Sequence, residues 1–281
     1  MRYNFYDFAW RYENMKTGFI GGGNMAEALI KGIRGQVSGD RREIFVSEPK
    51  EDRRHYLEKT YNIKTTESNK QLVSSCDIII LAVKPQIMDM VIEEIGEAVT
   101  EDKTVVSIAA GITLAYLQSK LNTKKLVRIM PNTPALVQEG MSVMSLCECF
   151  SDRDIDFVRE IFMSIGEVMT LPEKYMNAVT AVSGSGPAFI AYFIEAMIEG
   201  GINAGLNKDD AFTLAVQTAV GTAQLLDSGL SPSKLREMVT SPGGTTAAGL
   251  RAFEEKGFKE TVSFVIEAAK NRADELGKGR D

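Results

Sequence analysis

Short apolar runs alternate with helical patterns of hydrophobic residues between Met15 and Leu171. Several runs are apolar throughout, as in residues 78–83, which is typical of parallel strands covered on both faces. The predicted strands are Lys16–Ile20, Ile44–Ser47, Asp77–Val83, Thr104–Ile108, Leu126–Met130, Gly140–Ser145 and Glu167–Leu171. The predicted helices between them are Glu51–Thr60, Gln86–Ile95, Thr113–Lys120 and Ser151–Ser164. The alternation predicts an α/β fold over residues 15–171, with a doubly wound parallel sheet.

The pattern changes after Pro172, and residues 172–281 are predicted to form an all-helical domain. Its predicted helices are Glu173–Ser183, Pro187–Ala204, Lys208–Ser228, Pro232–Val239, Thr245–Glu255 and Lys259–Leu276. The segment Ala188–Ile194 is apolar on every face, which is typical of a helix buried all round. Because so small a helical domain cannot bury that helix alone, we expect a partner subunit to cover it.

Composition narrows the class of protein. With 44% hydrophobic and 25% charged residues, the chain lies in the range of soluble globular proteins. The net charge is −6 and the basic residues form only pairs such as Arg41-Arg42, so we expect no nucleic-acid partner. The longest strongly apolar stretch, Ala188–Ile194, is too short to span a bilayer, so we expect no membrane partner either.

Cysteine usage indicates a reducing setting. Cys76, Cys147 and Cys149 form no disulfide framework, which favours a cytoplasmic location. The pair Cys147-x-Cys149 would suit a metal or a redox couple. The favoured interpretation is small side chains in or near a strand, so no metal site is predicted.

The turn after the first predicted strand carries the clearest chemistry. Residues 21–26 read G-x-G-x-x-A and run directly into a helical pattern. Gly21 permits the tight turn, Gly23 lets the backbone approach a pyrophosphate, and Ala26 lets helix and strand pack closely. The helix N-terminus then offers free N–H groups to the phosphates. The motif predicts a dinucleotide-binding domain of Rossmann type.

Three further segments follow predicted strands, where the carboxyl ends of a parallel sheet face the ligand crevice. In Ala82–Pro85, Lys84 is either a ligand contact or a solvated loop lysine. The small residues of Ser107–Gly111 would admit a flat ring or simply allow tight packing. In Arg128–Pro134, two prolines fix a loop and Asn132 offers amide hydrogen bonds, with a rigid connection as the alternative.

Two segments of the helical domain are rich in glycine and hydroxyl groups. Ser183–Pro187 lies between two predicted helices, and Ser241–Thr246 precedes another. The second combines glycines, hydroxyls and a helix N-terminus, which suits a small carboxylate. The alternative is an ordinary glycine-rich helix start.

The chain resembles the Δ1-pyrroline-5-carboxylate reductase family. The segments that carry the resemblance, in family order, are Phe19–Ala26, Ala82–Pro85, Ser107–Gly111, Arg128–Pro134, Ser183–Ala188 and Ser241–Thr246. The resemblance implies reduction of (S)-1-pyrroline-5-carboxylate to L-proline with NADPH or NADH, the last step of proline biosynthesis. It also implies that the helical domain interlocks with a second subunit, in homodimers that the family often assembles into decamers.

The resemblance also implies roles for individual residues. The expected cofactor-binding residues are Gly21, Gly23, Asn24, Met25 and Ala26 at the pyrophosphate, Ser47, Glu48 and Asn69 near the adenosine ribose, Ala82, Val83, Lys84 and Pro85 toward the nicotinamide, and Ala109 and Asn132. The expected substrate-binding residues are Val182, Ser183, Ser241, Gly244, Thr245 and Thr246, of which Thr246 is the catalytic candidate that donates to the ring nitrogen. His55, the only histidine, is predicted to be a solvated surface residue, so a protonated imine substrate is expected.

The charge of Glu48 bears on cofactor choice. An acidic residue at the end of the second strand suits a ribose 2′-OH and would repel a 2′-phosphate, which predicts that NADH is used at least as well as NADPH. Arg53 and Arg54 are the counter-argument, because they could reach a phosphate.

Two rival functions remain. A β-hydroxyacid dehydrogenase carries a catalytic lysine after its Gly-Ser-Gly stretch, but here Pro187–Tyr192 follows and contains no lysine. A non-catalytic NAD(P)-sensing scaffold would not need the carboxylate cradle of Ser241–Thr246.

Residues 1–14 are rich in aromatic side chains and lack the features of a signal peptide. They are either an upstream start or cloning remnant, or a real extension that packs on a partner. We predict that removing them leaves activity nearly unchanged, because the α/β domain begins at Met15. Steady-state kinetics and the oligomeric state of the shortened chain check this, and a loss of either would show that the extension is structural.

Overall fold

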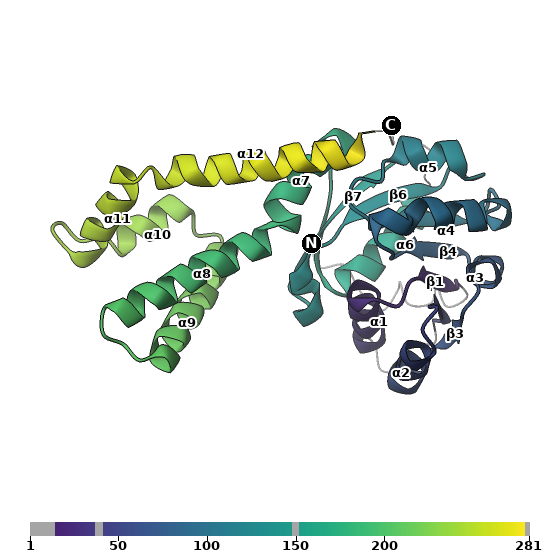
Figure 1. The fold of residues 1–281 in the computed structure, drawn as a ribbon, viewed down its shortest axis with the longest axis horizontal. Coiled ribbons are helices and arrows are strands. Elements are labelled where there is room, and N and C mark those ends of the chain that lie inside the picture. The colour runs from purple at the N-terminus through teal and green to yellow at the C-terminus, as the bar shows by residue number, and fades with distance from the viewer. Residues whose placement is uncertain (1–14, 37–41, 148–151, 279–281) are drawn as a thin grey trace. The chain divides into compact units, whose positions relative to one another are not determined.

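The computed structural model describes residues 15–36, 42–147 and 152–278. The chain forms two compact units, one from Met1–Gly184 with Ala269–Asp281 and the other from Ser185–Ala268 (Figure 1). The predicted boundary at residues 171/172 coincides with the end of the sheet, whose last strand closes at Thr170. The division between the compact units falls later, after Gly184.

Eight strands form one sheet in the described part of the first unit. They are β1 Thr17–Ile20, β2 Ile44–Ser47, β3 Lys64–Thr66, β4 Ile78–Leu81, β5 Thr104–Ser107, β6 Leu126–Met130, β7 Gly140–Leu146 and β8 Gly166–Thr170. Their order is β3-β2-β1-β4-β5-β6-β7-β8, and the predicted α/β fold with a Rossmann-type doubly wound sheet is confirmed. The short polar strand β3 was not predicted from the sequence, because it lacks an apolar run.

The strand β7 corrects the prediction of a fully parallel sheet, since it runs antiparallel to β6. The connection between them, residues 131–139, holds only the 3-10 helix η4, Thr133–Val137. A parallel crossover needs a dozen residues or more, so this short link returns the chain in the opposite direction.

Helices cover both faces of the sheet. Those of the first unit are α1 Asn24–Gln36, α2 Glu51–Tyr61, α3 Asn69–Ser75, α4 Met88–Ile95, α5 Leu114–Lys120 and α6 Asp152–Met163, with the 3-10 turns η2 Pro85–Ile87, η3 Gly96–Ala98 and η5 Glu173–Tyr175. Side chains of α1 and α6 pack on one face, and those of α3, α4 and α5 pack on the other. The short helix α3 was missed by the sequence analysis, because its polar residues show no helical period.

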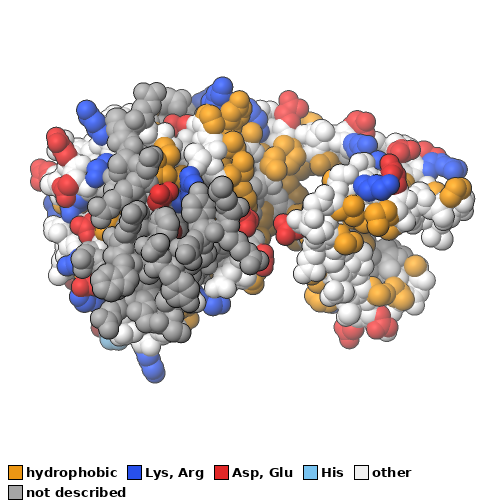
Figure 2. All heavy atoms as spheres, turned by 180° about the vertical axis from the view of Figure 1, so that it is seen from behind, with side chains coloured by type: hydrophobic (Ala, Val, Ile, Leu, Met, Phe, Trp, Pro, Cys, Tyr) orange, Lys and Arg blue, Asp and Glu red, His pale blue; other side chains and the backbone are white. Residues whose placement is uncertain are grey.

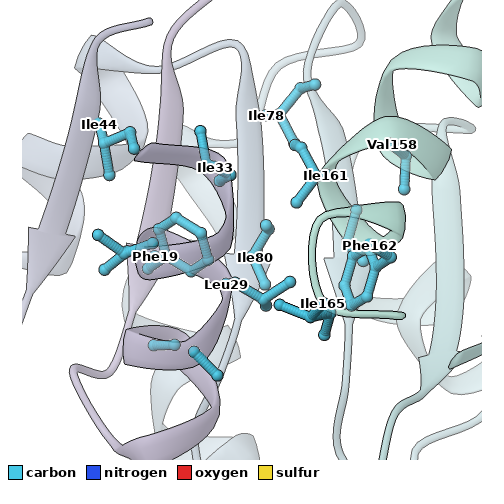
Figure 3. Packing of buried hydrophobic residues seen from close by; sticks show 14 of the residues in the cluster. Phe19, Leu29, Ile33, Ile44, Ile78, Ile80, Val158, Ile161, Phe162 and Ile165 are labelled. Carbon is cyan, nitrogen blue, oxygen red and sulfur yellow. The ribbon is translucent and has the colours of Figure 1, made fainter. Parts of the chain in front are cut away.

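The alternation of side chains along each strand divides the core into these two layers. Phe19 and Ile80 point to the α1 and α6 side, where they pack with Leu29 and Phe162 (Figure 3). The next residue of β1, Ile20, points to the opposite layer. Each such side chain is fully buried, and its burial stabilises the fold by roughly 1.5–3 kcal/mol.

The segment after the sheet combines three kinds of helix. Beyond η5, α7 covers Met176–Val179 and a π-helix covers Thr180–Gly184. The sequence predicted one regular helix here, Glu173–Ser183. The π turn changes the direction in which the last residues point, and it was not readable from the hydrophobic pattern.

The second unit is all-helical, as predicted. It contains α8 Gly186–Asn203, α9 Lys208–Asp227, α10 Pro232–Met238, α11 Thr245–Glu255 and the first part of α12, Phe258–Gly277. The side chain of Ser231 caps α10 by accepting a hydrogen bond from the amide of Lys234 at 3.3 Å. Helices α8 and α9 lie side by side (Figure 1).

The helical unit exposes a large apolar surface. Helix α8 has no buried residue, and its Tyr192 is 75% exposed, so the helix expected to be buried all round is uncovered in a single chain. Hydrophobic side chains gather over this unit (Figure 2). Only a small core forms inside it, with Ala211 and Ala215 buried on α9. Such a surface is typical of a subunit interface.

The helical run Glu173–Asn203 is longer than the apolar stretch from which the sequence analysis argued against a membrane span. Among the described helices it alone is long and apolar enough to cross a bilayer, with a mean hydropathy of 1.3, and 6% of its apolar window is buried. Ala188–Ile194 was therefore too narrow a window on which to judge the segment. Length and composition alone are weak evidence of a membrane span, since an interface helix of a soluble protein has the same properties.

Two glycines of α1 should respond oppositely to alanine. A methyl group at Gly32 would lie 2.6 Å from the carbonyl oxygen of Ser164, whereas the nearest atom at Gly35 is 3.8 Å away. We predict that Gly32→Ala destabilises the fold by about 1–3 kcal/mol through overpacking. Gly35→Ala should stabilise it by about 0.4–1 kcal/mol. Urea unfolding of both variants checks this, and equal effects would contradict the packing argument.

Candidate cofactor and substrate site

The glycine turn lies at the point where the strand order reverses. β1 has β2 on one side and β4 on the other, and ligands of open α/β sheets bind in the crevice at such a position. Gly21 follows β1 with a φ of 98°, and its amide donates to the carbonyl oxygen of Ser47 at 2.8 Å. A side chain at Gly21 would lie 2.7 Å from the carbonyl oxygen of Ala82, so only glycine fits.

The other residues of the motif form a cradle that fits a pyrophosphate. A methyl group at Gly23 would meet no atom within 4 Å, so the backbone there is open to a ligand. Helix α1 begins at Asn24, and the first-turn amides of Asn24, Met25 and Ala26 have no carbonyl partner one turn earlier. Ala26 is fully buried beneath the helix, as the motif predicts. Open space beside free amides is the arrangement that an anion requires.

Glu48 lies beside this cradle. One of its carboxylate oxygens accepts from the amide of Gly22 at 3.0 Å and the other from the amide of Lys50 at 3.1 Å. Two backbone bonds therefore fix the carboxylate against the glycine turn, where an adenosine ribose would lie.

The other two residues expected at the ribose are joined to each other. The hydroxyl of Ser47 donates to Asn69 Oδ1 at 2.7 Å, and Asn69 Nδ2 donates to Glu94 at 2.7 Å. Ser47 is buried, so its hydroxyl is committed within the protein. Of the three predicted residues, Glu48 is thus the one whose side chain bonds directly to the glycine turn.

The end of β4 meets the same turn. The amide of Ala82 donates to the carbonyl oxygen of Ile20 at 2.9 Å, and Val83 lies close to Gly21. Lys84 is exposed and precedes η2, which begins at Pro85. The structure therefore brings Ala82 and Val83 to the predicted cleft and leaves both interpretations of Lys84 open.

Ala109 and Asn132, two further residues expected at the cofactor, both make contacts within the protein. Ala109 is buried in the core layer of α4 and α5. Asn132 accepts from the amide of Met141 at 2.8 Å and donates to Ser183 at its carbonyl oxygen, 3.2 Å, and its hydroxyl, 3.3 Å. Its amide group joins the end of β6 to the π-helix, a contact between distant segments that no local pattern indicates.

The π-helix presents the two residues expected at the edge of the substrate pocket. Val182 is 60% exposed and Ser183 is half-buried. The hydroxyl of Thr180 donates to the carbonyl oxygen of Met176 at 2.8 Å inside the same turn. Single π turns occur frequently at functional sites, and the role of Val182 and Ser183 in the substrate pocket stays a prediction.

A partly buried ion pair holds the start of this segment. Arg128 Nη1 lies 3.0 Å from Glu173 Oε1, which also accepts from the amide of Leu114 at 2.8 Å. The pair joins the middle of β6, the first turn of α5 and the start of η5. The arginine of the predicted loop therefore has a positioning role that the sequence did not indicate.

The predicted substrate cradle forms a single turn in the helical unit. The amide of Gly244 donates to the carbonyl oxygen of Ser241 at 3.0 Å, and Gly243 has a φ of 70°. Helix α11 begins at Thr245, and Gly244 provides no side-chain cap. The turn places Ser241, Gly244, Thr245 and Thr246 at the start of α11, and their role as a carboxylate site stays a prediction.

A cluster around Glu27 was missed by the sequence analysis. Its carboxylate accepts from Arg53 at 2.5 Å and from the hydroxyls of Tyr56 and Tyr61 at 2.8 Å each. Burial acts to raise the pKa of Glu27, but the hydrogen bonds from Arg53, Tyr61 and Tyr56 outweigh it and hold that pKa below its usual value. Burial, together with the Glu27 carboxylate, raises the pKa of Tyr61. Both groups therefore keep their usual charge states at neutral pH.

The histidine and the cysteines add little to the description of the site. His55 lies on α2 with its side chain 69% exposed, which confirms the predicted surface location. Among the described residues no cluster of His, Cys, Asp and Glu suits a metal ion. Cys147 is a free thiol, and Cys149 lies outside the described residues.

The fold and the glycine cradle define a dinucleotide-dependent oxidoreductase with a Rossmann domain. The family described as "NADP oxidoreductase coenzyme F420-dependent" matches residues 16–111, and the one described as "Pyrroline-5-carboxylate reductase dimerisation" matches residues 173–276. The pyrroline-5-carboxylate reductase of a Synechocystis strain is 39% identical, over 94% of this chain and 99% of its own. This chain belongs to the pyrroline-5-carboxylate reductase family.

Solved structures agree with this assignment. A Plasmodium falciparum pyrroline carboxylate reductase with NADP bound is 33% identical, with a TM-score of 0.83 over 95% of this chain and 99% of its own. A Coxiella burnetii pyrroline-5-carboxylate reductase is also 33% identical, with a TM-score of 0.87 over 94% of this chain and 99% of its own. The rival assignment to the β-hydroxyacid dehydrogenases is therefore dropped.

The two glycines of the cradle should separate folding from cofactor binding. We predict that Gly23→Ala changes the free energy of unfolding by less than about 0.5 kcal/mol, because its methyl group meets no protein atom. The same variant should weaken NAD(P)H binding at least about tenfold, because the methyl group fills the cradle. Gly21→Ala should destabilise the fold itself by about 1–3 kcal/mol, since its φ is 98°. Calorimetric titration with unfolding curves checks both, and tight cofactor binding by Gly23→Ala would contradict the cradle.

Proposed function

We propose that this chain reduces (S)-1-pyrroline-5-carboxylate to L-proline with NAD(P)H, the last step of proline biosynthesis. The observation that carries the proposal is the open glycine cradle at the strand-order reversal, in a chain whose residues 173–276 match the reductase dimerisation family. When bound, the cofactor supplies the hydride for the C=N carbon. The protein then has to bind, orient and protect the two reactants.

The residues divide these tasks. The amides after Gly23 hold the pyrophosphate, and Glu48 takes the ribose hydroxyl. Asn132 holds Ser183 and with it the π turn at the edge of the substrate pocket. Ser241 and the first amides of α11 hold the substrate carboxylate.

Thr246 is the proposed donor to the ring nitrogen. It is half-buried in the first turn of α11, next to the carboxylate cradle. The only histidine, His55, is exposed on α2 and takes no part in the proposal. A cyclic imine is basic enough to arrive protonated, so the hydroxyl of Thr246 orients the nitrogen and stabilises the amine that forms.

The assembly proposed is an interlocked homodimer, with the family's decamer as the larger form. Its support is the uncovered apolar helix α8, which a second copy would bury. Burial in the dimer would also account for the apolar run Glu173–Asn203 without a membrane. The proposed location is the cytoplasm, with pyrroline-5-carboxylate and proline as small-molecule partners.

One assay tests the function. Purified chain is mixed with pyrroline-5-carboxylate and NADPH or NADH, and both cofactor oxidation and proline formation are measured. Equal amounts of cofactor oxidised and proline formed would support the reductase. Cofactor binding without proline would instead favour the NAD(P)-sensing scaffold.

Cofactor preference should depend on Glu48. We predict that the unmodified chain uses NADH at least as well as NADPH. The carboxylate of Glu48 repels a 2′-phosphate by about 1–4 kcal/mol at a separation of about 4 Å. Glu48→Ser should therefore shift kcat/KM toward NADPH. Kinetics with both cofactors check this, and a strong NADPH preference in the unmodified chain would contradict it.

Hydroxyl variants should distinguish chemistry from binding in the substrate cradle. We predict that Thr246→Ala lowers kcat more than it raises KM for pyrroline-5-carboxylate, by up to about 100-fold. Thr246→Ser keeps the hydroxyl and should keep most of the activity. Ser241→Ala should act mainly on KM, because a carboxylate contact is equally strong before and during reaction. Unchanged kcat in Thr246→Ala would remove that residue from the chemistry.

A further inference from the structure

The side chain of Arg53 is held at two points. Its Nε donates to the carbonyl oxygen of Gly22 at 2.7 Å, and its Nη2 donates to Glu27 Oε2 at 2.5 Å. The two side chains of the ion pair are 26% and 20% exposed. An arginine on α2 is thus tied both to the glycine turn and to the first turn of α1.

Glu27 is itself fixed in place. Its second carboxylate oxygen accepts from the hydroxyls of Tyr56 and Tyr61 at 2.8 Å each. The guanidinium of Arg53 also lies over the ring of Tyr56, 5.0 Å from its centroid. Glu27 therefore anchors the arginine, and two tyrosine hydroxyls bond its other carboxylate oxygen.

Gly22 connects this cluster to the ribose end of the cradle. Its carbonyl oxygen accepts from Arg53, and its amide donates to Glu48 at 3.0 Å. Arg53 and Glu48 are therefore bonded to opposite ends of one residue. An arginine near this position is the usual partner of a 2′-phosphate in Rossmann domains.

The neighbouring arginine, Arg54, also bonds to protein groups. Arg54 Nη1 donates to the carbonyl oxygens of Glu48, at 2.8 Å, and Pro49, at 3.0 Å. Its Nη2 lies 3.9 Å from Glu67. Both arginines thus have protein partners next to the carboxylate of Glu48.

We propose that Glu27 determines cofactor specificity by withholding Arg53 from the 2′-phosphate of NADP(H). This inference rests on the proposed NAD(P)H-dependent function. Glu27 forms a charge-assisted bond to the guanidinium, which a phosphate would have to replace. Without the carboxylate, only the neutral carbonyl of Gly22 and the ring of Tyr56 hold Arg53, and its planar fork is suited to a phosphate. Glu27 is a specificity residue that acts through Arg53 and touches no reactant.

The test measures nucleotide binding rather than turnover. Glu27→Gln removes the charge and keeps the shape of the side chain. Calorimetric titration of the full-length chain with 2′,5′-ADP and with 5′-ADP gives the ratio of the two dissociation constants. We expect this ratio to shift at least about tenfold toward 2′,5′-ADP in Glu27→Gln, and to return in the double variant Glu27→Gln/Arg53→Ala.

Glu58→Gln is the matched control. Glu58 is also a carboxylate bonded to a hydroxyl, that of Thr65 at 2.5 Å, so this variant loses the same charge without touching Arg53. It should leave the ratio unchanged.

Two outcomes would overturn the inference. An unchanged ratio in Glu27→Gln, which includes equal weakening of both nucleotides, or a gain that persists without Arg53 would each assign Glu27 a merely structural role. If the ratio shifts as expected in a chain that forms no proline, the inference is supported and the reductase function is contradicted. Failure of the inference and failure of the proposed function are therefore distinguishable.

Discussion

The contact between the backbones of β1 and β4 at Gly21 is the constraint on which the site depends. A left-handed φ of 98° turns the chain where the carbonyl oxygen of Ala82 leaves no room for a side chain. That turn directs α1 away from the sheet edge, which leaves its first amides free and opens the space beside Gly23. It also presents Gly22 to Glu48 on one side and to Arg53 on the other. One glycine thus sets the geometry of the open cradle and of the two charged side chains bonded beside it.

The features that the sequence predicted are those with a local physical cause. Buried parallel strands need unbroken apolar runs, so β1, β4 and β5 were located within a few residues of their observed ends. The glycine turn and the cap at Ser231 were predictable for the same reason, because backbone geometry and orphan amides restrict which residues fit. The turn Ser241–Thr246 likewise formed where its residues predicted a helix start.

What the sequence did not predict arises from contacts between distant segments. Asn132 bonds to Ser183 and Met141, and no periodicity encodes that pairing, while its expected place at the cofactor stays a prediction. The Glu27 cluster joins one residue of α1 to three residues of α2, and the hydrophobic pattern of neither helix indicates that contact. The reversal of β7 follows from the length of a loop rather than from the composition of the strand. Individual roles of site residues therefore depend on packing that only the folded chain reveals.

Because the face of α8 is uncovered in a single chain, the stability of the helical unit depends on the concentration of the protein. A helical unit with two buried alanines on α9 and none of the α8 side chains buried has little cohesion of its own. Its stability then derives from association, and by mass action it falls as the chain is diluted. The first unit has two complete core layers and no such dependence. Dilution would thus dismantle the part that contains the turn Ser241–Thr246 before it affects the part that contains the glycine cradle, which links the integrity of the helical unit to the concentration of the chain.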